Sequence, residues 1–171
     1  MDIKTTRMLA RYNAWANKTL FDAVAALPAG EATRERASLF PSMVHSLNHL
    51  YVVDLIWQAH LQGREHGIPA LNAVLHDDLA ELWEVQQDID DWYIGWADEL
   101  TAAQADETVR FKLVSGNRGE MKRADVMLHV VNHTSYHRGF VADMFYQIPA
   151  RPPLTDLPVY LRESAQEKAS K

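Results

Sequence analysis

The chain has 171 residues, a formal net charge of −6, 47% hydrophobic residues and no cysteine. This length and composition are typical of one globular domain with a hydrophobic core. The lack of cysteine excludes disulfide bonds, cysteine-ligated zinc and a cysteine nucleophile, and an acidic balance without a basic cluster argues against a nucleic-acid partner.

The N-terminus becomes amphipathic at once and does not resemble a signal peptide. No apolar run approaches the roughly 18 residues that a membrane span requires. We therefore expect a cytoplasmic protein without a membrane partner.

Apolar residues recur at intervals of three and four over residues 3–27, which predicts a helix that ends at Pro28. A second helix is predicted over 41–62, because Pro41 suits a first turn, and a third over 76–100. The acidic run Asp88, Asp90 and Asp91 in the third helix is interpreted as a solvated face.

Residues 108–113 alternate as a strand does, and Ser115-Gly116-Asn117 supplies a turn, so a short hairpin is predicted. A fourth helix follows over 123–147, and a short helix over 159–165. The predicted fold is an all-α four-helix bundle with this hairpin inserted between helices three and four. Residues 1–165 form its single domain, and 166–171 form a frayed tail.

Three histidines spaced by four, His129, His133 and His137, lie in the fourth helix. An i, i+4 pair places two imidazoles on one face about 6 Å apart, the spacing with which a helix holds one metal ion. A third ligand would come from His45 or His49 in the second helix. Spacing alone leaves open which pair of the three and which of these two take part.

The order and spacing of several motifs resemble the DinB / YfiT-like superfamily of metal-binding four-helix proteins. The motifs are Tyr12-Asn13-x-Trp15-Ala16-Asn17, Ser42, Asn48-His49-x4-Asp54-x2-Trp57, His133-x3-His137-Arg138-Gly139 and Asp156-Leu157-Pro158-x-Tyr160-Leu161. The resemblance implies a three-histidine site made of His49, His133 and His137, with His45 and His129 one turn earlier on each helix.

Residues near these ligands are candidates for supporting roles. Asp54 and Asn132 are candidates to accept a hydrogen bond from a ligating imidazole, although Asp54 is equally an ordinary carboxylate on the helix surface or a structural residue that accepts an N–H bond. Arg138 is a candidate to contact an anionic substrate group, or to pair with a carboxylate such as Asp54 or Asp143. Tyr12, Trp15 and Trp57 are candidates to border a substrate pocket, although core packing is the more common role of such aromatics.

Other metal enzymes are excluded by residue type. The chain has no Glu-x-x-His for a di-iron bundle, and no Glu follows His133 as in a zincin. Characterised relatives in the superfamily include transferases and isomerases that use low-molecular-weight thiols such as bacillithiol or mycothiol. The resemblance thus implies a thiol S-transferase acting on a small electrophile. A metal-dependent hydrolase and a non-catalytic metal-binding stress protein are the alternatives.

Ligand type fits zinc, nickel, cobalt or copper, and zinc or nickel is the preferred expectation. The thiol would come from outside, because the chain has none. The other expected partners are a small-molecule substrate and a second copy of the chain. Five tryptophans exceed the evident needs of one core, so we expect a homodimer that covers apolar surface.

Overall fold

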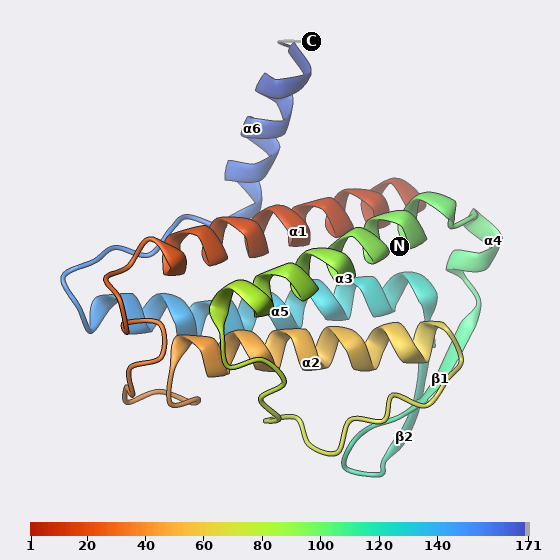
Figure 1. Cartoon of the computed structure of the whole chain (residues 1–171). Helices are drawn as coiled ribbons and strands as arrows, with labels where there is room; N and C mark the ends of the chain where they lie inside the picture. The colour runs from red at the N-terminus through yellow and green to blue at the C-terminus, as the bar shows by residue number, and fades with distance from the viewer. Residues whose placement is uncertain (170–171) are drawn as a thin grey trace.

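A computed structural model describes residues 1–169 of the chain and shows four long helices in a bundle (Figure 1). The long helices are α1 (Ile3–Ala25), α2 (Met43–Leu61), α3 (Leu79–Glu99) and α5 (Arg123–Tyr146). The smaller elements are α4 (Ala102–Ala105), β1 (Thr108–Lys112), β2 (Arg118–Lys122) and α6 (Leu157–Ala169). The predicted all-α bundle is confirmed, and the hairpin lies between its third and fourth long helices. Over the described residues, no helix is both long and apolar enough to cross a membrane.

Side-chain caps explain where the helices begin. The Ser42 hydroxyl accepts a hydrogen bond from the backbone N–H of His45, so α2 begins at Met43, slightly later than predicted. The Asp78 carboxylate accepts bonds from the N–H groups of Ala80 and Glu81, which places the start of α3 at Leu79 instead of residue 76. Such caps satisfy N–H groups that have no partner inside the helix.

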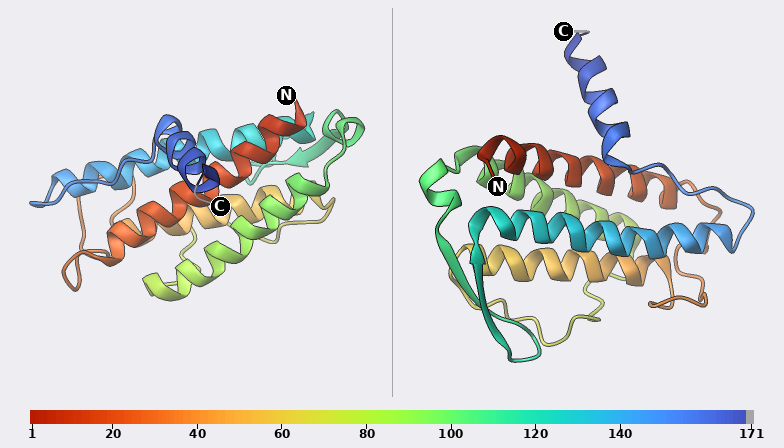
Figure 2. Two further views of the ribbon diagram at one scale, coloured as in Figure 1. Left: turned by 90° about the horizontal axis from the view of Figure 1, so that it is seen from above. Right: turned by 180° about the vertical axis from the view of Figure 1, so that it is seen from behind.

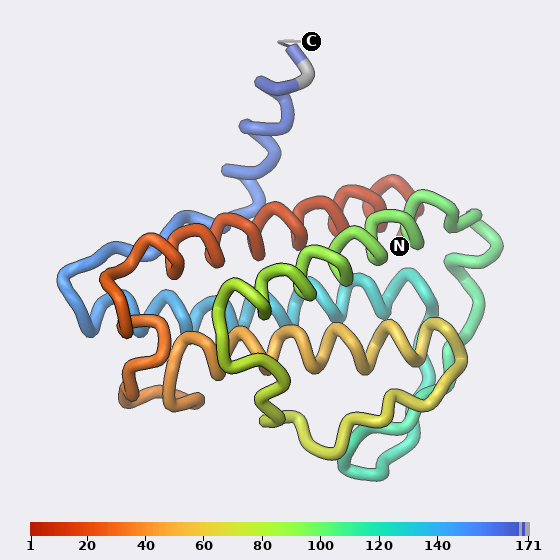
Figure 3. Tube along the Cα trace, viewed as in Figure 1, coloured from red at the N-terminus to blue at the C-terminus, as the bar shows by residue number. Residues whose placement is uncertain are grey.

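Each long helix packs against two others: α1 lies beside α3 and α5, and α2 lies beside α5 and α3 (Figure 2). The helix α2 is buried on almost every side, because the loop 62–78 and the hairpin cover what α3 and α5 leave open. Figure 3 shows this loop crossing the outside of α2 on its way to α3. The side chains of α2 are therefore held in place from several directions.

The hairpin is anchored to the bundle by Phe111. Its ring packs on Trp57 of α2, with ring centroids 4.9 Å apart, and also covers Gly119, its partner across the strands. A Cβ atom on Gly119 would lie 2.6 Å from the Phe111 ring. Glycine at this position lets the aromatic ring cover the backbone of the neighbouring strand.

The C-terminal helix α6 projects away from the bundle and rests on α1 (Figure 1). The Tyr12 hydroxyl donates a hydrogen bond to the Thr155 carbonyl at 2.8 Å, and the Trp15 indole N–H donates to Glu163 at 3.1 Å. The helix includes residues 166–169, beyond the predicted end of the domain at residue 165, and fraying of this end stays a prediction. Their composition (Gln, Glu, Lys and Ala) favours continuation of a helix; residues 170 and 171 lie outside the described residues.

The tryptophans lend no support to the predicted dimer. Trp57 is buried, and the other four are half-buried against the core clusters. The large exposed apolar side chains are instead residues such as Tyr136, Tyr146 and Leu154. The homodimer stays a prediction.

Candidate metal centre

His49, His133 and His137 converge where α2 packs along α5. Each offers one ring nitrogen, and the three nitrogens lie within 4.8 Å of one another. His49 Nε2 is 3.2 Å from His137 Nε2. Two nitrogens bound tetrahedrally to one ion at about 2.05 Å would be roughly 3.3 Å apart, so this pair already has the spacing of two ligands.

A backbone carbonyl orients His49. Its Nδ1–H donates a hydrogen bond to the carbonyl oxygen of Leu71, in the loop 62–78, at 2.7 Å. This bond fixes the tautomer, so that Nε2 carries the lone pair and faces His137. The neighbouring Asn48 holds the same loop, since its side-chain oxygen accepts from the N–H groups of Leu75 and His76.

The histidines are kept neutral by burial and by one another. Burial lowers the pKa of His133 to about 3, and repulsion from His137, His49 and His129 adds to this effect. Burial and then His49 lower the pKa of His137 to about 4. Burial also lowers the pKa of His49, against the opposing effect of its bond to Leu71. Neutral imidazoles are the form that binds metal ions.

The residues present fit a divalent ion. The Nδ1 atoms of His133 and His137 are buried and have no hydrogen-bond partner among the described residues. For His137 this is the other ring nitrogen, since its Nε2 is the one at ligand spacing from His49. Three neutral nitrogens on two rigid helices form the donor set of a three-histidine site.

The adjacent histidines lie outside this cluster. The His129 ring is 5.9 Å from that of His133 but only 4.6 Å from that of Trp57, so it packs mainly against the tryptophan. His45 stacks on Phe40 at 5.9 Å. The structure brings together the same three histidines that the family resemblance implied, a choice that helical spacing had left open.

Asp54 and Asn132 are not placed to orient a ligating histidine. The Asp54 carboxylate is fully buried and accepts a bond from Gln86, and Asn132 is exposed to solvent. Arg138 is also buried, so its guanidinium is not positioned to meet a substrate at the surface. The ring of His49 is oriented by its bond to the Leu71 carbonyl instead of by Asp54 or Asn132. Asp54 and Arg138 belong to a polar network inside the bundle.

The aromatic residues beside the site differ from those predicted. Tyr12 and Trp15 pack with Tyr160 of α6, and Trp57 lies against His129. The rings next to the cluster are instead Phe40, with its centroid 4.7 Å from His49, and Tyr136 and Phe140, at 5.0 and 5.7 Å from His137. Phe140 could have been found from its position three residues after His137, which places the two side chains beside each other on the helix. Helical spacing does not single out Tyr136, one residue before His137.

Arg138 is the centre of a network that we did not predict. Its Nη1 donates to the side-chain oxygens of Asn13 and Asn17 at 3.1 and 3.0 Å, and its Nη2 donates to the Ser135 hydroxyl at 2.8 Å. The Asn17 amide donates in turn to both carboxylate oxygens of Asp90. Asp90 is therefore buried in the core, and the predicted solvated face is wrong for this residue; Asp88 and Asp91 are exposed.

Two buried carboxyl groups complete the network. The Gln86 amide bonds Asp54 at 3.0 Å and Asp90 at 3.4 Å. Burial raises the pKa of Asp90 to about 7, against the bonds from Asn17 and Gln86. Burial, and then the Asp90 charge, raise the pKa of Asp54 well above its ordinary range. Burial and the neighbouring charge of Asp90 therefore both favour the protonated form of Asp54.

Taken together, the bundle and its cluster define a class of helical proteins with a three-histidine site that could hold a metal ion. The sequence model of the DinB family matches residues 1–169, and the chain belongs to that family. A curated relative, Protein DinB from Bacillus subtilis (strain 168), is 30% identical over 166 residues, which cover 94% of this chain and 96% of the relative. The resemblance found in the motifs is confirmed.

The lowered histidine pKa values predict an acid-sensitive cluster. Between pH 6.5 and about 3, unfolded His133 binds a proton that the folded residue does not, so stability falls as pH falls. His133→Gln removes this effect. We expect the metal-free variant to lose less stability than wild type between pH 7.5 and 5, by at most about 1.4 kcal/mol per pH unit, in urea unfolding with a chelator present.

The buried carboxyl groups act in the opposite direction. The raised pKa of Asp90 makes the folded state bind more protons than the unfolded state between about pH 4 and 7, so acidification stabilises it there. Wild type and His133→Gln share this effect of the carboxyl groups, so it cancels when their free energies of unfolding are subtracted. Parallel stability curves for wild type and variant would contradict the prediction.

Proposed function

We propose that His49, His133 and His137 bind one divalent ion, zinc or nickel, and that the site transfers a low-molecular-weight thiol to a small electrophile. The observation that carries the proposal is the convergence of three neutral imidazoles, two buried and one half-buried, with two of them already at ligand spacing. Three protein ligands leave a coordination position for a further group, as in catalytic zinc sites.

A divalent ion at this position would lower the pKa of a bound thiol, so that it reacts as a thiolate at neutral pH. The chain contributes orientation: Leu71 holds the His49 ring, and α5 holds the other two. Phe40, Tyr136 and Phe140 offer an apolar surface for the electrophile. In the transfer the thiol loses its proton to solvent, sulfur forms a bond to the electrophilic carbon, and the leaving group departs with the electron pair of its broken bond.

Hydrolysis is less well supported. It would need a base beside the ion to accept a proton from water. Among the described residues, Asp54 and Asp90 are tied into the network around Arg138, and no hydrogen bond links a carboxylate to one of the three histidines. The thiol reaction does not require such a base, because a thiol is far more acidic than water.

The proposal is tested by a metal-dependent thiol assay. Chelated protein reloaded with zinc or nickel is mixed with monochlorobimane and a panel of small thiols that includes bacillithiol, mycothiol, cysteine and glutathione. We expect at least one thiol to react about 100-fold faster than in buffer, only with the reloaded protein. Full metal binding without acceleration for any thiol would identify a non-catalytic site, and no metal binding would overturn the proposal entirely.

A further inference from the structure

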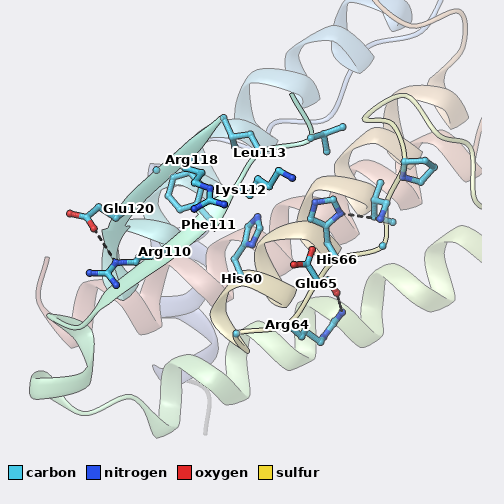
Figure 4. A pocket seen from close by; sticks show the side chains of 16 residues that line it. His60, Arg64, Glu65, His66, Arg110, Phe111, Lys112, Leu113, Arg118 and Glu120 are labelled. Atoms are coloured by element: carbon cyan, nitrogen blue, oxygen red, sulfur yellow. Dashed lines mark hydrogen bonds and ion pairs between the residues drawn. The ribbon is translucent and has the colours of Figure 1, made fainter. Parts of the chain in front are cut away.

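A cleft of about 870 Å³ lies between the loop that follows α2 and the β1–β2 hairpin (Figure 4). Its inner wall includes His60, near the end of α2. His60 follows His49 by eleven residues, or roughly 16 Å along the helix axis. The Trp57 ring packs between His60 and His129, which separates the cleft from the three-histidine cluster.

The walls of the cleft carry flat and apolar groups. The His60 ring meets His66 edge to face, with centroids 5.6 Å apart, and Phe111 lies 5.8 Å from His60. Ile68 and Leu113 add aliphatic surface at the rim. A volume of this size falls in the range of sites for small organic molecules.

The charged groups of the cleft are mainly positive. Lys112 and Arg118 are directly opposed across the hairpin, a like-charged pair that destabilises an antiparallel pair of strands. No carboxylate among the described residues pairs with either of them, whereas Arg110 is paired with Glu120 at 3.5 Å. The Arg64 guanidinium bonds only neutral acceptors, the side-chain oxygens of Gln58 and Gln62 and a backbone carbonyl.

The imidazoles add hydrogen-bond donors. The backbone N–H of Ile68 donates to Nδ1 of His66 at 3.0 Å, so the proton of the neutral ring is on Nε2, which is left as a donor. His60 is 9% exposed, and its Nε2 has no partner among the described residues. Glu65 is the one lining carboxylate that has no cation partner in the described part of the chain.

We propose that this cleft binds a small organic anion with a flat apolar body and a carboxylate, phosphate or sulfonate group. The rings and aliphatic side chains would cover the body. Lys112, Arg118 and His66 would surround the anionic group with donors. The chain has a net charge of −6, yet its exposed hairpin carries two cations that no carboxylate neutralises. An anionic ligand that neutralises these two cations would explain why they lie together.

The probe for the test is 2-naphthoate, titrated into isotopically labelled full-length protein and followed through backbone amide shifts. We expect saturable shifts that concentrate on residues 60–69 and 108–120. Neutral 2-naphthol should bind at least about tenfold more weakly, because it lacks the carboxylate. The same Kd is expected with a chelator present, because the three-histidine site is separate.

Lys112→Glu/Arg118→Glu should raise the Kd by at least about tenfold. The matched control, Lys4→Glu/Arg151→Glu, makes the same change in net charge at exposed positions outside the cleft, and should leave the Kd within about twofold. If charge reversal prevents folding, Lys112→Gln/Arg118→Gln provides the same comparison. Unsaturable binding, equal loss in the control, equal binding of 2-naphthol, or a Kd that changes on chelation would each overturn the proposal.

Discussion

His137→Ala is expected to abolish high-affinity binding of a divalent ion, with a rise in Kd of at least about 100-fold for zinc. One of the two nitrogens already at ligand spacing is removed, and the remaining two histidines lie on different helices. The apolar packing of the four helices is unaffected, so the helical signal in circular dichroism should be retained. Calorimetric titration of the chelated protein with zinc measures the change in affinity.

His129→Ala is the matched control for this substitution. It removes the same ring two turns earlier on the same helix, from a position that packs on Trp57. We expect its zinc affinity to remain within about threefold of wild type. Equal loss of zinc in both variants would mean that the ion is held elsewhere on α5, and unchanged binding in His137→Ala would exclude the proposed ligand set.

The second large effect is expected at Arg138, where substitution by leucine should lower the free energy of unfolding by about 3–5 kcal/mol. Arg138 is 3% exposed, and its guanidinium bonds Asn13 and Asn17, the second of which holds Asp90. Its loss leaves buried acceptors without donors and a buried carboxylate without its cation. Urea unfolding at pH 7 measures this change, and exposed Arg151→Leu is the control, with an expected change within about 0.5 kcal/mol.

Asp54→Asn in the same network should have a much smaller effect, within about 1 kcal/mol at pH 7. The raised pKa favours the neutral form of folded Asp54, and asparagine has nearly the shape of a protonated acid. Because the pKa is raised, Asp54 contributes stability that is present at acid pH and is lost as pH rises through the folded pKa. The variant should lack this dependence. A loss at pH 7 as large as that of Arg138→Leu would show that Asp54 is ionised in the core.

The bundle and the histidine pair were predictable because they are repeated local patterns. Apolar periodicity gave the four helices, and the i, i+4 spacing of His133 and His137 placed both rings on one face. The choice of His133 and His137 over His129 and His133, like that of His49 over His45, needed the family resemblance. Spacing within one helix does not determine how that helix is rotated against a neighbour.

The orientation of the site could not be read from the sequence, because it depends on loops. The carbonyl that holds His49 belongs to Leu71, and any residue type at that position presents the same group. Phe40, which covers the cluster, lies in a connection without periodicity. Both contacts follow from how the chain between helices folds back, which local propensity does not encode.

The polar network left a signal that we misinterpreted. Asn13 and Asn17, and likewise Gln86 and Asp90, are spaced by four and lie on the inward faces of α1 and α3. Polar residues on an apolar face are informative because burial is unfavourable unless they have partners. The partner here, Arg138, is more than 100 residues away from Asn13 and Asn17 in sequence.

Because α6 projects from the bundle, the chain has two parts that we expect to unfold separately: α6 and the four-helix bundle. The C-terminal segment is attached mainly through Tyr12 and Trp15 of α1, and Leu161 on α6 remains 47% exposed. Detaching it exposes little apolar surface, whereas separating α2 from α5 exposes a large part of the core. We therefore expect the amides of α6 to exchange with solvent through local opening, and those of α2 and α5 to exchange only when the whole bundle unfolds.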